Sequence, residues 1–430
     1  MSNAMKEADP VSELSRLRLY LLKMNPPSFG HPQSAGTWTT RVEYQEWPLH
    51  QGLRSQATLA WPARFFATGG RFASTHLRGL LGLAVGLAAI VAMGGALSRP
   101  SPSSLSTSVT GDAVLAARAR PLLSGALDRV SIAVVDGTTI TYANFGARQD
   151  TEYEIGSITK TFTGLLLADA IERGEVTADT RLGALLPLAG APVADVTLAE
   201  LASHRAGLSA QGMQLDETIP FLVRLQMHRN PFEQDRDGVL AIARKATLTT
   251  RGEFVYSNLG TALLGHALAS MAHRDYVTLV QQRLLIPLGM SATTLPLTAK
   301  DLRTDAPTGY SADGAGEAPW TVNGWGPAGG ARSTPADMAR FARALLDGSA
   351  PGMDALMPQW DIIQGAQQIG YAWQTQRYKG HLVTFKTGLT GGFTSKIALD
   401  RDSDRAVIVL SNTVAQVDDA TNRLLVPDFP

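Results

Sequence analysis

Residues 154–164 have the sequence EIGSITKTFTG, in which the hydroxyl of Ser157 and the amine of Lys160 lie three residues apart. Apolar residues recur at helical spacing after Ser157, and Gly174 marks the end of the predicted helix. Residues three apart share a helix face and side chains lean toward the N-terminus, so the Lys160 amine is directed at the Ser157 hydroxyl. A serine hydroxyl is a poor nucleophile until a base takes its proton. The stretch therefore predicts a nucleophile with its own base at a helix N-terminus.

Lys160 can act as a base only if its surroundings hold it neutral. Lysine has an unperturbed pKa of about 10.4, and burial beside another cation could lower it to about 7. Only eight of the 38 basic residues are lysines, and two of these are Lys160 and Lys386. Arginine cannot be deprotonated in a protein, so a base position would exclude it. A Ser-x-x-Lys tetrapeptide can also occur by chance on the surface of a helix, so this segment alone does not establish a catalytic site.

A second segment, Tyr256-Ser257-Asn258, carries a phenol and an amide two residues apart. In an extended loop both side chains point the same way, toward whatever the Ser157 helix faces. Tyr256 would then carry a proton between Ser157 and a leaving group, and Asn258 would hold a substrate amide. The alternative is a packed loop tyrosine, with Asn258 capping a helix over residues 259–269.

The third segment begins as a predicted strand over residues 381–387 and continues into a glycine-rich turn at Gly388. Glycine there would permit close backbone approach by a ligand. The N–H of Leu389 could face the Ser157 N–H and complete an oxyanion hole. Lys386 would attract a substrate carboxylate. The alternative is a glycine-rich hairpin with a solvated lysine.

The order of these segments resembles the serine β-lactamase and penicillin-binding peptidase superfamily, within it the class C β-lactamases and their low-molecular-weight D-Ala-D-Ala peptidase relatives. Residues 154–164 look like the nucleophile segment of that family, and residues 386–393 look like its third motif. Further similar stretches lie at residues 201–208, 252–254, 286–290 and 333–339. The resemblance covers about residues 113–425.

The resemblance implies a role for each matched residue. Ser157 would be the acylated nucleophile, with Lys160 and Tyr256 as the proton-transfer pair. The substrate-binding residues would be Asn258, Lys386, Thr387, Gly388 and Leu389. His204, the one histidine in a matched stretch, looks structural.

Two departures from the family pattern point in opposite directions. Ser257 stands where class C β-lactamases usually have alanine, which favours peptidases and general relatives. Lys386 stands where many peptidase and esterase relatives have histidine, which favours β-lactamases. There is also no class A type "ExxLN" segment, so deacylation would have to run through Tyr256 and Lys160.

The predicted fold class is α+β, with an antiparallel sheet built from both chain ends, flanked by helices and carrying an inserted helical lobe. Strand patterns at 131–135 and 139–145 flank the hairpin signal Asp136-Gly137, and a second pair lies at 394–399 and 405–410. Long helical segments lie between the two pairs. Terminal strands around a helical middle favour this arrangement, which is also the fold that the resemblance implies.

The first hundred residues differ from the rest. An uncharged apolar run over 79–97 has nearly the length needed to span a bilayer, and the arginines before it place the N-terminus in the cytoplasm. We therefore expect a catalytic part in the periplasm, either exported by a signal peptide that is cleaved after Ala96 or tethered by an uncleaved anchor. A buried soluble helix is the alternative. The expected divisions are a disordered tail over 1–78, the apolar segment 79–97, a linker over 98–112 and a catalytic domain over 113–430.

The composition of the chain indicates which kinds of binding partner to expect. A net charge of zero argues against nucleic acid, and eight scattered histidines without any cysteine provide no metal-ligand set, so we expect neither metal nor cofactor. The membrane would be a partner only through 79–97 if that segment is uncleaved, and a monomer is expected. The leading function is a serine hydrolase that acts on a small β-lactam or a peptidoglycan peptide of the D-Ala-D-Ala type through an acyl-enzyme. The alternatives are a low-molecular-weight D,D-carboxypeptidase, an esterase of the same fold, or a penicillin-binding sensor that acylates without turnover.

Overall fold

The computed structural model describes residues 104–426 except residue 379. The predicted tail over 1–78 and the apolar run over 79–97 lie outside the described residues. Within the described range no helix combines the length and apolarity needed to cross a bilayer. Strand β1 (Val109–Gly111) pairs with the main sheet. This end of the predicted linker therefore belongs to the folded domain, which begins before residue 113.

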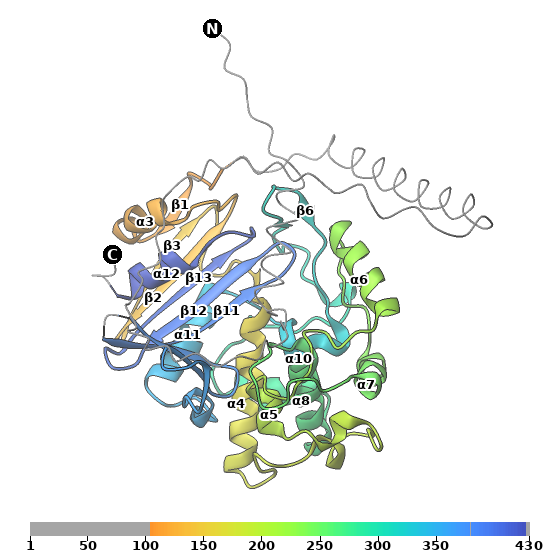
Figure 1. Cartoon of the computed structure of the whole chain (residues 1–430). Helices are drawn as coiled ribbons and strands as arrows, with labels where there is room; N and C mark the ends of the chain where they lie inside the picture. The colour runs from red at the N-terminus through yellow and green to blue at the C-terminus, as the bar shows by residue number, and fades with distance from the viewer. Residues whose placement is uncertain (1–103, 379, 427–430) are drawn as a thin grey trace, which may run out of the picture. The chain divides into compact units, whose positions relative to one another are not determined.

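A nine-stranded antiparallel sheet forms the centre of the domain, in the order β1-β3-β2-β13-β12-β11-β10-β9-β8 (Figure 1). Strands β2 (Val130–Asp136) and β3 (Thr139–Phe145) come from the N-terminal part of this domain, and β2 pairs directly with β13 (Arg405–Ser411). The remaining strands are β12 (Thr394–Asp400), β11 (His381–Leu389), β10 (Gln374–Tyr378), β9 (Gln367–Ile369) and β8 (Trp360–Ile363). The predicted sheet from both chain ends is confirmed, as are both predicted hairpins.

Helices cover both faces of this sheet, because successive side chains of each strand point to opposite faces. Ile132 and Val134 face a smaller core closed by α3 (Ala113–Ala119) and α12 (Asp418–Leu425). Ala133 and Val135 face the larger core, closed by α4 (Thr159–Glu172) and α11 (Pro335–Leu346).

The predicted helical lobe lies in sequence between β4 (Tyr153–Glu154) and β7 (Arg332–Ser333), and it packs against α4. It contains α5 (Leu198–Ala202), α6 (Leu215–Gln226), α7 (Arg236–Lys245), α8 (Asn258–Met271), α9 (Tyr276–Val280) and the short α10 (Gly326–Gly329). Helix α4 is buried over most of its circumference, since it lies between the lobe and the sheet. Its Gly164 leaves no room for a side chain, because a Cβ atom there would lie 2.2 Å from the Tyr371 carbonyl oxygen.

A short two-stranded ladder fixes the approach to α4. Strand β4 (Tyr153–Glu154) pairs with β7 (Arg332–Ser333). The Arg332 side chain is 2% exposed and donates to Glu152 at 2.7 Å and to Glu154 at 2.8 Å. A buried cation is tolerated when it is paired and hydrogen-bonded in this way. The ladder therefore holds the segment before Ser157 against the segment that contains α10.

Candidate active site

Ser157 lies in a one-turn 3-10 helix, Gly156–Ile158, that leads into α4. The preceding Gly156 has φ +48°, and a side chain at that position would lie 2.7 Å from the Leu389 backbone nitrogen. Only glycine combines this backbone conformation with so close a neighbour. The result is that Ser157 begins the buried helix directly beside the end of β11. Both N–H groups predicted for an oxyanion hole, those of Ser157 and Leu389, therefore belong to adjoining segments.

The Lys160 amine is the centre of the hydrogen-bond network around Ser157. Its Nζ lies 3.0 Å from the Ser157 Oγ, 2.7 Å from the Asn258 Oδ1 and 2.6 Å from the Ala328 carbonyl oxygen. The last two atoms can only accept hydrogen bonds. A neutral amine would use its two N–H groups for these two acceptors, which leaves its lone pair for the Ser157 hydroxyl. The geometry thus fits a base.

The environment of Lys160 favours this neutral form. The side chain is fully buried, and burial together with the charge of Lys386 holds the pKa of Lys160 well below the usual lysine value. Burial lowers the pKa of Lys386 itself to about 7. In the part of the chain that the structure describes, neither amine forms an ion pair with a carboxylate. Burial thus lowers the pKa of both lysines, and the charge of Lys386 lowers that of Lys160 further.

Tyr256 also contacts the Ser157 hydroxyl. Its phenol O–H donates to the Ser157 Oγ at 2.7 Å. The Nζ atoms of Lys160 and Lys386 each lie 5.0 Å from the centre of its ring. Both amines therefore lie close to this phenol, which suits a proton carrier.

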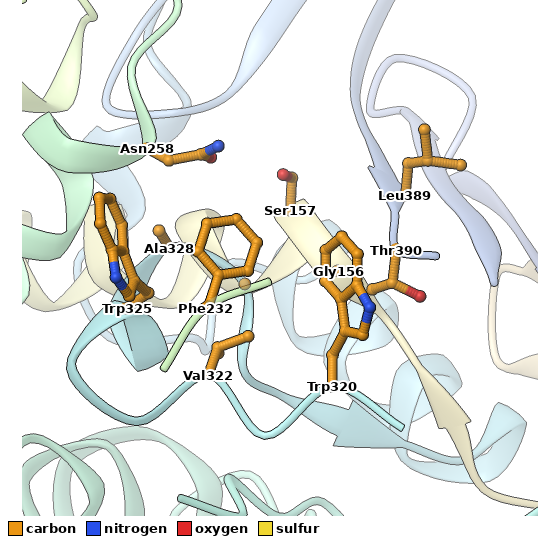
Figure 2. A pocket seen from close by; sticks show the side chains of 11 residues that line it. Gly156, Ser157, Phe232, Asn258, Trp320, Val322, Trp325, Ala328, Leu389 and Thr390 are labelled. Atoms are coloured by element: carbon orange, nitrogen blue, oxygen red, sulfur yellow. The ribbon is translucent and has the colours of Figure 1, made fainter. Parts of the chain in front are cut away.

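Asn258 faces Ser157 from the first turn of α8 (Figure 2). The N-cap of this helix is Ser257, whose hydroxyl accepts from the Gly260 N–H at 3.0 Å, so the alternative of Asn258 as a cap is wrong. Because the Asn258 oxygen accepts from Lys160, its Nδ2 hydrogens are the ones that could donate to a substrate carbonyl.

His204 packs against the segment that contains Tyr256 and Ser257. Its ring centre lies 4.5 Å from that of Tyr256, and its Nδ1 accepts from the Ser257 N–H at 3.3 Å. Burial, with the nearby charges of Lys386 and Lys160, holds its pKa well below the usual histidine value. A neutral ring that orders Tyr256 agrees with the structural role expected for this histidine.

The structure shows what surrounds Gly388 and Lys386. A side chain at Gly388 would lie 2.0 Å from the Ile155 carbonyl oxygen, so this glycine allows close packing of β11 on the chain before Ser157. Lys386 is 2% exposed and points into the network around Tyr256, so the alternative of a solvated lysine is wrong. Thr387 follows it with partial exposure.

A pocket opens beside Ser157 and encloses about 340 Å³, part of it open to solvent (Figure 2). Ser157, Asn258 and Leu389 line it together with eight residues that were not predicted as site residues, among them Phe232, Trp320, Val322 and Trp325. Within the described residues, no charged side chain lines this pocket. Its walls are therefore mostly apolar and aromatic.

The pocket wall is tied to the buried ion pairs. The Trp320 backbone N–H donates to the Glu154 carboxylate at 2.9 Å, and Glu154 also accepts from Arg332. Burial raises the pKa of Glu154, although Arg332 opposes this effect. The indole N–H of Trp325 donates to Gln234 at 2.9 Å. Trp320 is thus fixed through its backbone and Trp325 through its indole.

Sequence reasoning missed these wall residues because they lie in irregular segments without a periodic pattern. The one available signal was the glycine-rich stretch 326–330, which directly precedes the matched residues 333–339. It contains Ala328, whose carbonyl oxygen accepts from Lys160. Over residues 104–426, no group of three His, Asp or Glu side chains is arranged to hold a metal ion.

Comparison with known proteins shows which family the chain belongs to. The model of the Beta-lactamase family matches residues 112–427. The D-alanyl-D-alanine-carboxypeptidase/endopeptidase AmpH of Escherichia coli (strain K12) is 26% identical over 302 residues, which cover 63% of this chain and 75% of that protein. A human protein named putative beta-lactamase-like 1 is 30% identical over 154 residues, 34% of this chain and 31% of that protein. The chain thus spans about a third of the length of this human relative.

Two solved structures share the fold. The D-alanine carboxypeptidase AmpC from Burkholderia cenocepacia has a TM-score of 0.60 at 23% identity, over 73% of this chain and 97% of that one. A class C beta-lactamase has a TM-score of 0.60 at 20% identity, over 69% and 90% of the two chains. The family match covers the sheet except strand β1, the helical lobe and every residue of the network around Ser157. The chain therefore belongs to the Beta-lactamase family, a family of serine hydrolases.

Proposed function

We propose that this chain hydrolyses β-lactams or D-Ala-D-Ala-type peptides through an acyl-enzyme on Ser157. The observation that carries the proposal is the position of the Lys160 amine, 3.0 Å from the Ser157 Oγ and otherwise bound to two carbonyl oxygens. An amine with these neighbours and a lowered pKa has the properties of a general base.

In the acylation step, the Ser157 oxygen attacks the substrate carbonyl carbon as its proton passes to the Lys160 lone pair. The negative charge that develops on the carbonyl oxygen would be stabilised by the N–H groups of Ser157 and Leu389. Tyr256 then delivers a proton to the leaving nitrogen, the carbon–nitrogen bond breaks, and the acyl group remains on Ser157 as an ester. The Tyr256 phenol is suited to this relay because it already donates to the Ser157 oxygen.

In the deacylation step, water takes the place of the leaving group. Tyr256, which gave its own proton to the leaving nitrogen, accepts a proton from this water as the water oxygen attacks the ester carbonyl. The carbon–oxygen bond to Ser157 breaks, and the Ser157 oxygen takes back the proton that Lys160 has held since acylation. The same two groups thus act in both directions, as they must when no further carboxylate base is available at this site.

An esterase of the same fold is the second candidate, and a specific observation favours it. A permanently charged Lys386 would be wasted on a neutral ester, which argues against such a substrate. Burial lowers the pKa of Lys386 to about 7, however, so this lysine is largely neutral in weakly alkaline solution. Neutral esters therefore belong in the test beside amides.

The test compares wild type with Ser157→Ala on three substrates: a chromogenic cephalosporin, a D-Ala-D-Ala peptide and a p-nitrophenyl ester. We expect the variant to lose turnover on each substrate that wild type hydrolyses, and intact-mass spectrometry to find an acyl adduct only in wild type. Equal activity in both proteins would overturn the proposal. A single equivalent of product without further turnover would instead identify a penicillin-binding sensor.

We propose in addition that the catalytic domain works in the periplasm. The support is the sequence alone, an uncharged apolar run over 79–97 preceded by Arg54, Arg64, Arg71 and Arg78 without an intervening acid. Mass spectrometry of protein from the native host tests this directly. An intact N-terminus in the soluble cytoplasm would contradict export, and an intact N-terminus in the membrane fraction would identify an anchor.

A further inference from the structure

We propose that helix α6 docks on the surface of a phospholipid bilayer through an exposed apolar stripe. The inference rests on the anchored form of the proposed periplasmic placement, in which residues 79–97 stay in the membrane. It adds a second contact between the same chain and the same bilayer. It does not depend on the chemistry proposed for Ser157.

Exposed apolar side chains follow one side of α6. Ile219, Leu222, Val223 and the C-cap residue Met227 are each between 43% and 60% exposed, and Pro220 is exposed beside them. Their spacing of three and four residues places them on one side of the helix, over a length of about 12 Å. We call these five residues the α6 stripe. A contiguous apolar stripe in water adds nothing to the stability of a soluble domain, so it indicates an interaction surface.

The other side of α6 is bound to the rest of the domain. Phe221 packs on Phe232, with 5.2 Å between the ring centres. Arg224 is the one charged residue between positions 219 and 227, and it pairs with Glu233. The helix is therefore held in place while the α6 stripe faces outward. Its charged residue already has a partner, so no unpaired charge opposes contact with an apolar surface.

The start of the domain limits how far α6 can lie from the bilayer. Residues 98–103 connect the apolar run to Ser104, the first described residue, and six residues reach at most about 20 Å. Strand β1 and helix α3 follow Ser104 and lie toward the same side of the domain as α6 and β6 (Gly316–Glu317), the upper side in Figure 1. Val109 on β1 and Val114 on α3 are exposed as well. A membrane close to Ser104 is therefore close to the side that carries the α6 stripe.

Two other occupants fit the α6 stripe less well. A stable interface with a second copy buries about 800 Å² on each partner, from about 20 to 30 residues, and five residues of one helix provide much less. The N-terminal tail over 1–78 would lie on the opposite side of the membrane from the domain, because its arginines place it in the cytoplasm. A bilayer needs no large interface here. The apolar run already holds the chain at the membrane, so a few inserted side chains are enough.

Helix α6 would lie in the plane of the membrane surface. Its 12 residues extend about 18 Å, too short to cross a bilayer. Interfacial helices bury their apolar side about 5 to 10 Å deep, at the boundary between headgroups and acyl chains. Phe221 joins α6 to Phe232, which lines the pocket beside Ser157. The contact would therefore set the distance of the proposed active site from the membrane.

The experiment places a fluorophore on the α6 stripe. The chain has no cysteine, so Val223→Cys gives a unique position for the environment-sensitive dye nitrobenzoxadiazole. The labelled full chain is reconstituted at one copy per phosphatidylcholine nanodisc. The matched control is Ile363→Cys, 58% exposed on β8, at the opposite edge of the sheet from β1. We expect emission at shorter wavelength from position 223 than from position 363, and quenching by lipids brominated in their acyl chains at position 223 alone.

Ile219→Ser combined with Met227→Ser tests the α6 stripe itself. Added to Val223→Cys, these changes remove apolar surface at both ends of the stripe. The ratio of docked to undocked chains should fall at least about tenfold, so most of the quenching by brominated lipids should be lost. Both side chains are exposed and neither lines the pocket, so thermal unfolding and hydrolysis of a soluble p-nitrophenyl ester should stay as in wild type.

Equal emission and quenching at the two label positions would overturn the inference, as would quenching at position 223 that the serine variants do not change. A shift that requires two copies per nanodisc would assign the α6 stripe to a second copy and overturn the lipid contact. A full chain that does not enter nanodiscs would overturn the membrane placement and the inference with it. The proposed hydrolysis fails or holds separately, because Ser157→Ala should leave the fluorescence unchanged.

Discussion

Each face of the central sheet buries one lysine, and the two lysines differ in whether a carboxylate lies beside them. Lys386 on β11 and Lys396 on the neighbouring β12 are each 2% exposed. The register pairs Lys386 with Ile397 and Lys396 with Thr387, so the two lysines point to opposite faces. Lys396 faces α12, where Asp418 and Asn422 accept from its Nζ. Lys386 faces Tyr256 and Lys160, where the described residues provide no carboxylate partner.

The difference shows that an equally buried lysine can stabilise the fold as an ion pair or can be available for proton transfer, depending on its neighbours. A carboxylate beside a buried ammonium group compensates for lost hydration and keeps the charge in place. Without that carboxylate, burial shifts the balance toward the neutral amine, which can bind a proton during a reaction. Arg332, buried between Glu152 and Glu154, follows the first pattern. Lys160 follows the second.

The largest expected effect is at Lys160. Lys160→Arg keeps the positive charge but removes the possibility of a neutral base, so kcat/KM should fall by about 10² to 10⁴. Lys396→Arg is the matched control, because an arginine there can still pair with Asp418. Steady-state kinetics on a p-nitrophenyl ester, with thermal unfolding of both variants, measures the effect. Activity of Lys160→Arg within tenfold of wild type would show that the amine is not the base.

The second effect concerns stability. Burial lowers the pKa of Lys386 to about 7 in the folded chain, so between pH 7 and about 10.4 the unfolded chain binds more protons and wild-type stability rises with pH. Lys386→Met removes this dependence. We expect the variant to exceed wild type by about 4 kcal/mol in free energy of unfolding at pH 6, with a gap that narrows as pH rises toward 10. Urea unfolding at pH 6, 8 and 9.5 measures the gap.

A gap of constant size across these pH values would mean that Lys386 titrates alike in both states. The corresponding Lys396→Met variant provides the comparison within the same sheet, since that lysine has its carboxylate.

The third effect is on the pH profile of the reaction. At pH 6 the charge of Lys386 helps to hold the pKa of Lys160 down. In Lys386→Met this repulsion is absent, so the Lys160 pKa should rise and the acid limb of kcat/KM should move to higher pH. Relative to wild type we expect about a tenfold loss at pH 6 and a smaller one at pH 8.5, where Lys386 is mostly neutral. A uniform loss at every pH would point to packing alone.

The smallest effect is expected for Lys396→Met. Asp418, its partner, is half exposed and can be hydrated by water once the lysine is removed. The free energy of unfolding should therefore fall by only about 1 kcal/mol. The pH profile of kcat/KM should match that of wild type. A displaced profile would show that the two faces of the sheet communicate electrostatically.

Much of the fold could be predicted from local patterns. Strands β2, β3, β12 and β13 have alternating or continuous apolar residues and clear turn signals, so their bounds were predicted to within one or two residues. Strand β1 was not predicted, because its three residues are exposed and have no apolar alternation. It is a strand only because β3 offers a free edge.

The site shows the same division. Spacing within the segment 157–160 was enough to predict the contact between Ser157 and Lys160, because both lie on one helical turn. The burial of Lys386 and the packing of Gly388 on Ile155 could not be predicted, since they depend on which segments meet across the fold. The pocket wall from Phe232 and Trp320 joins loops almost ninety residues apart for the same reason.

The pairing of β2 with β13 has a consequence for folding during synthesis on the ribosome. Val134 and its partner Val407 are separated by most of the domain. At translation speeds of about 5 to 20 residues per second, the early hairpin would wait roughly 15 to 50 s for its neighbour. During that interval the proposed nucleophile has been synthesised but Lys386 has not. The proposed site can therefore be completed only when nearly all of the chain has been made.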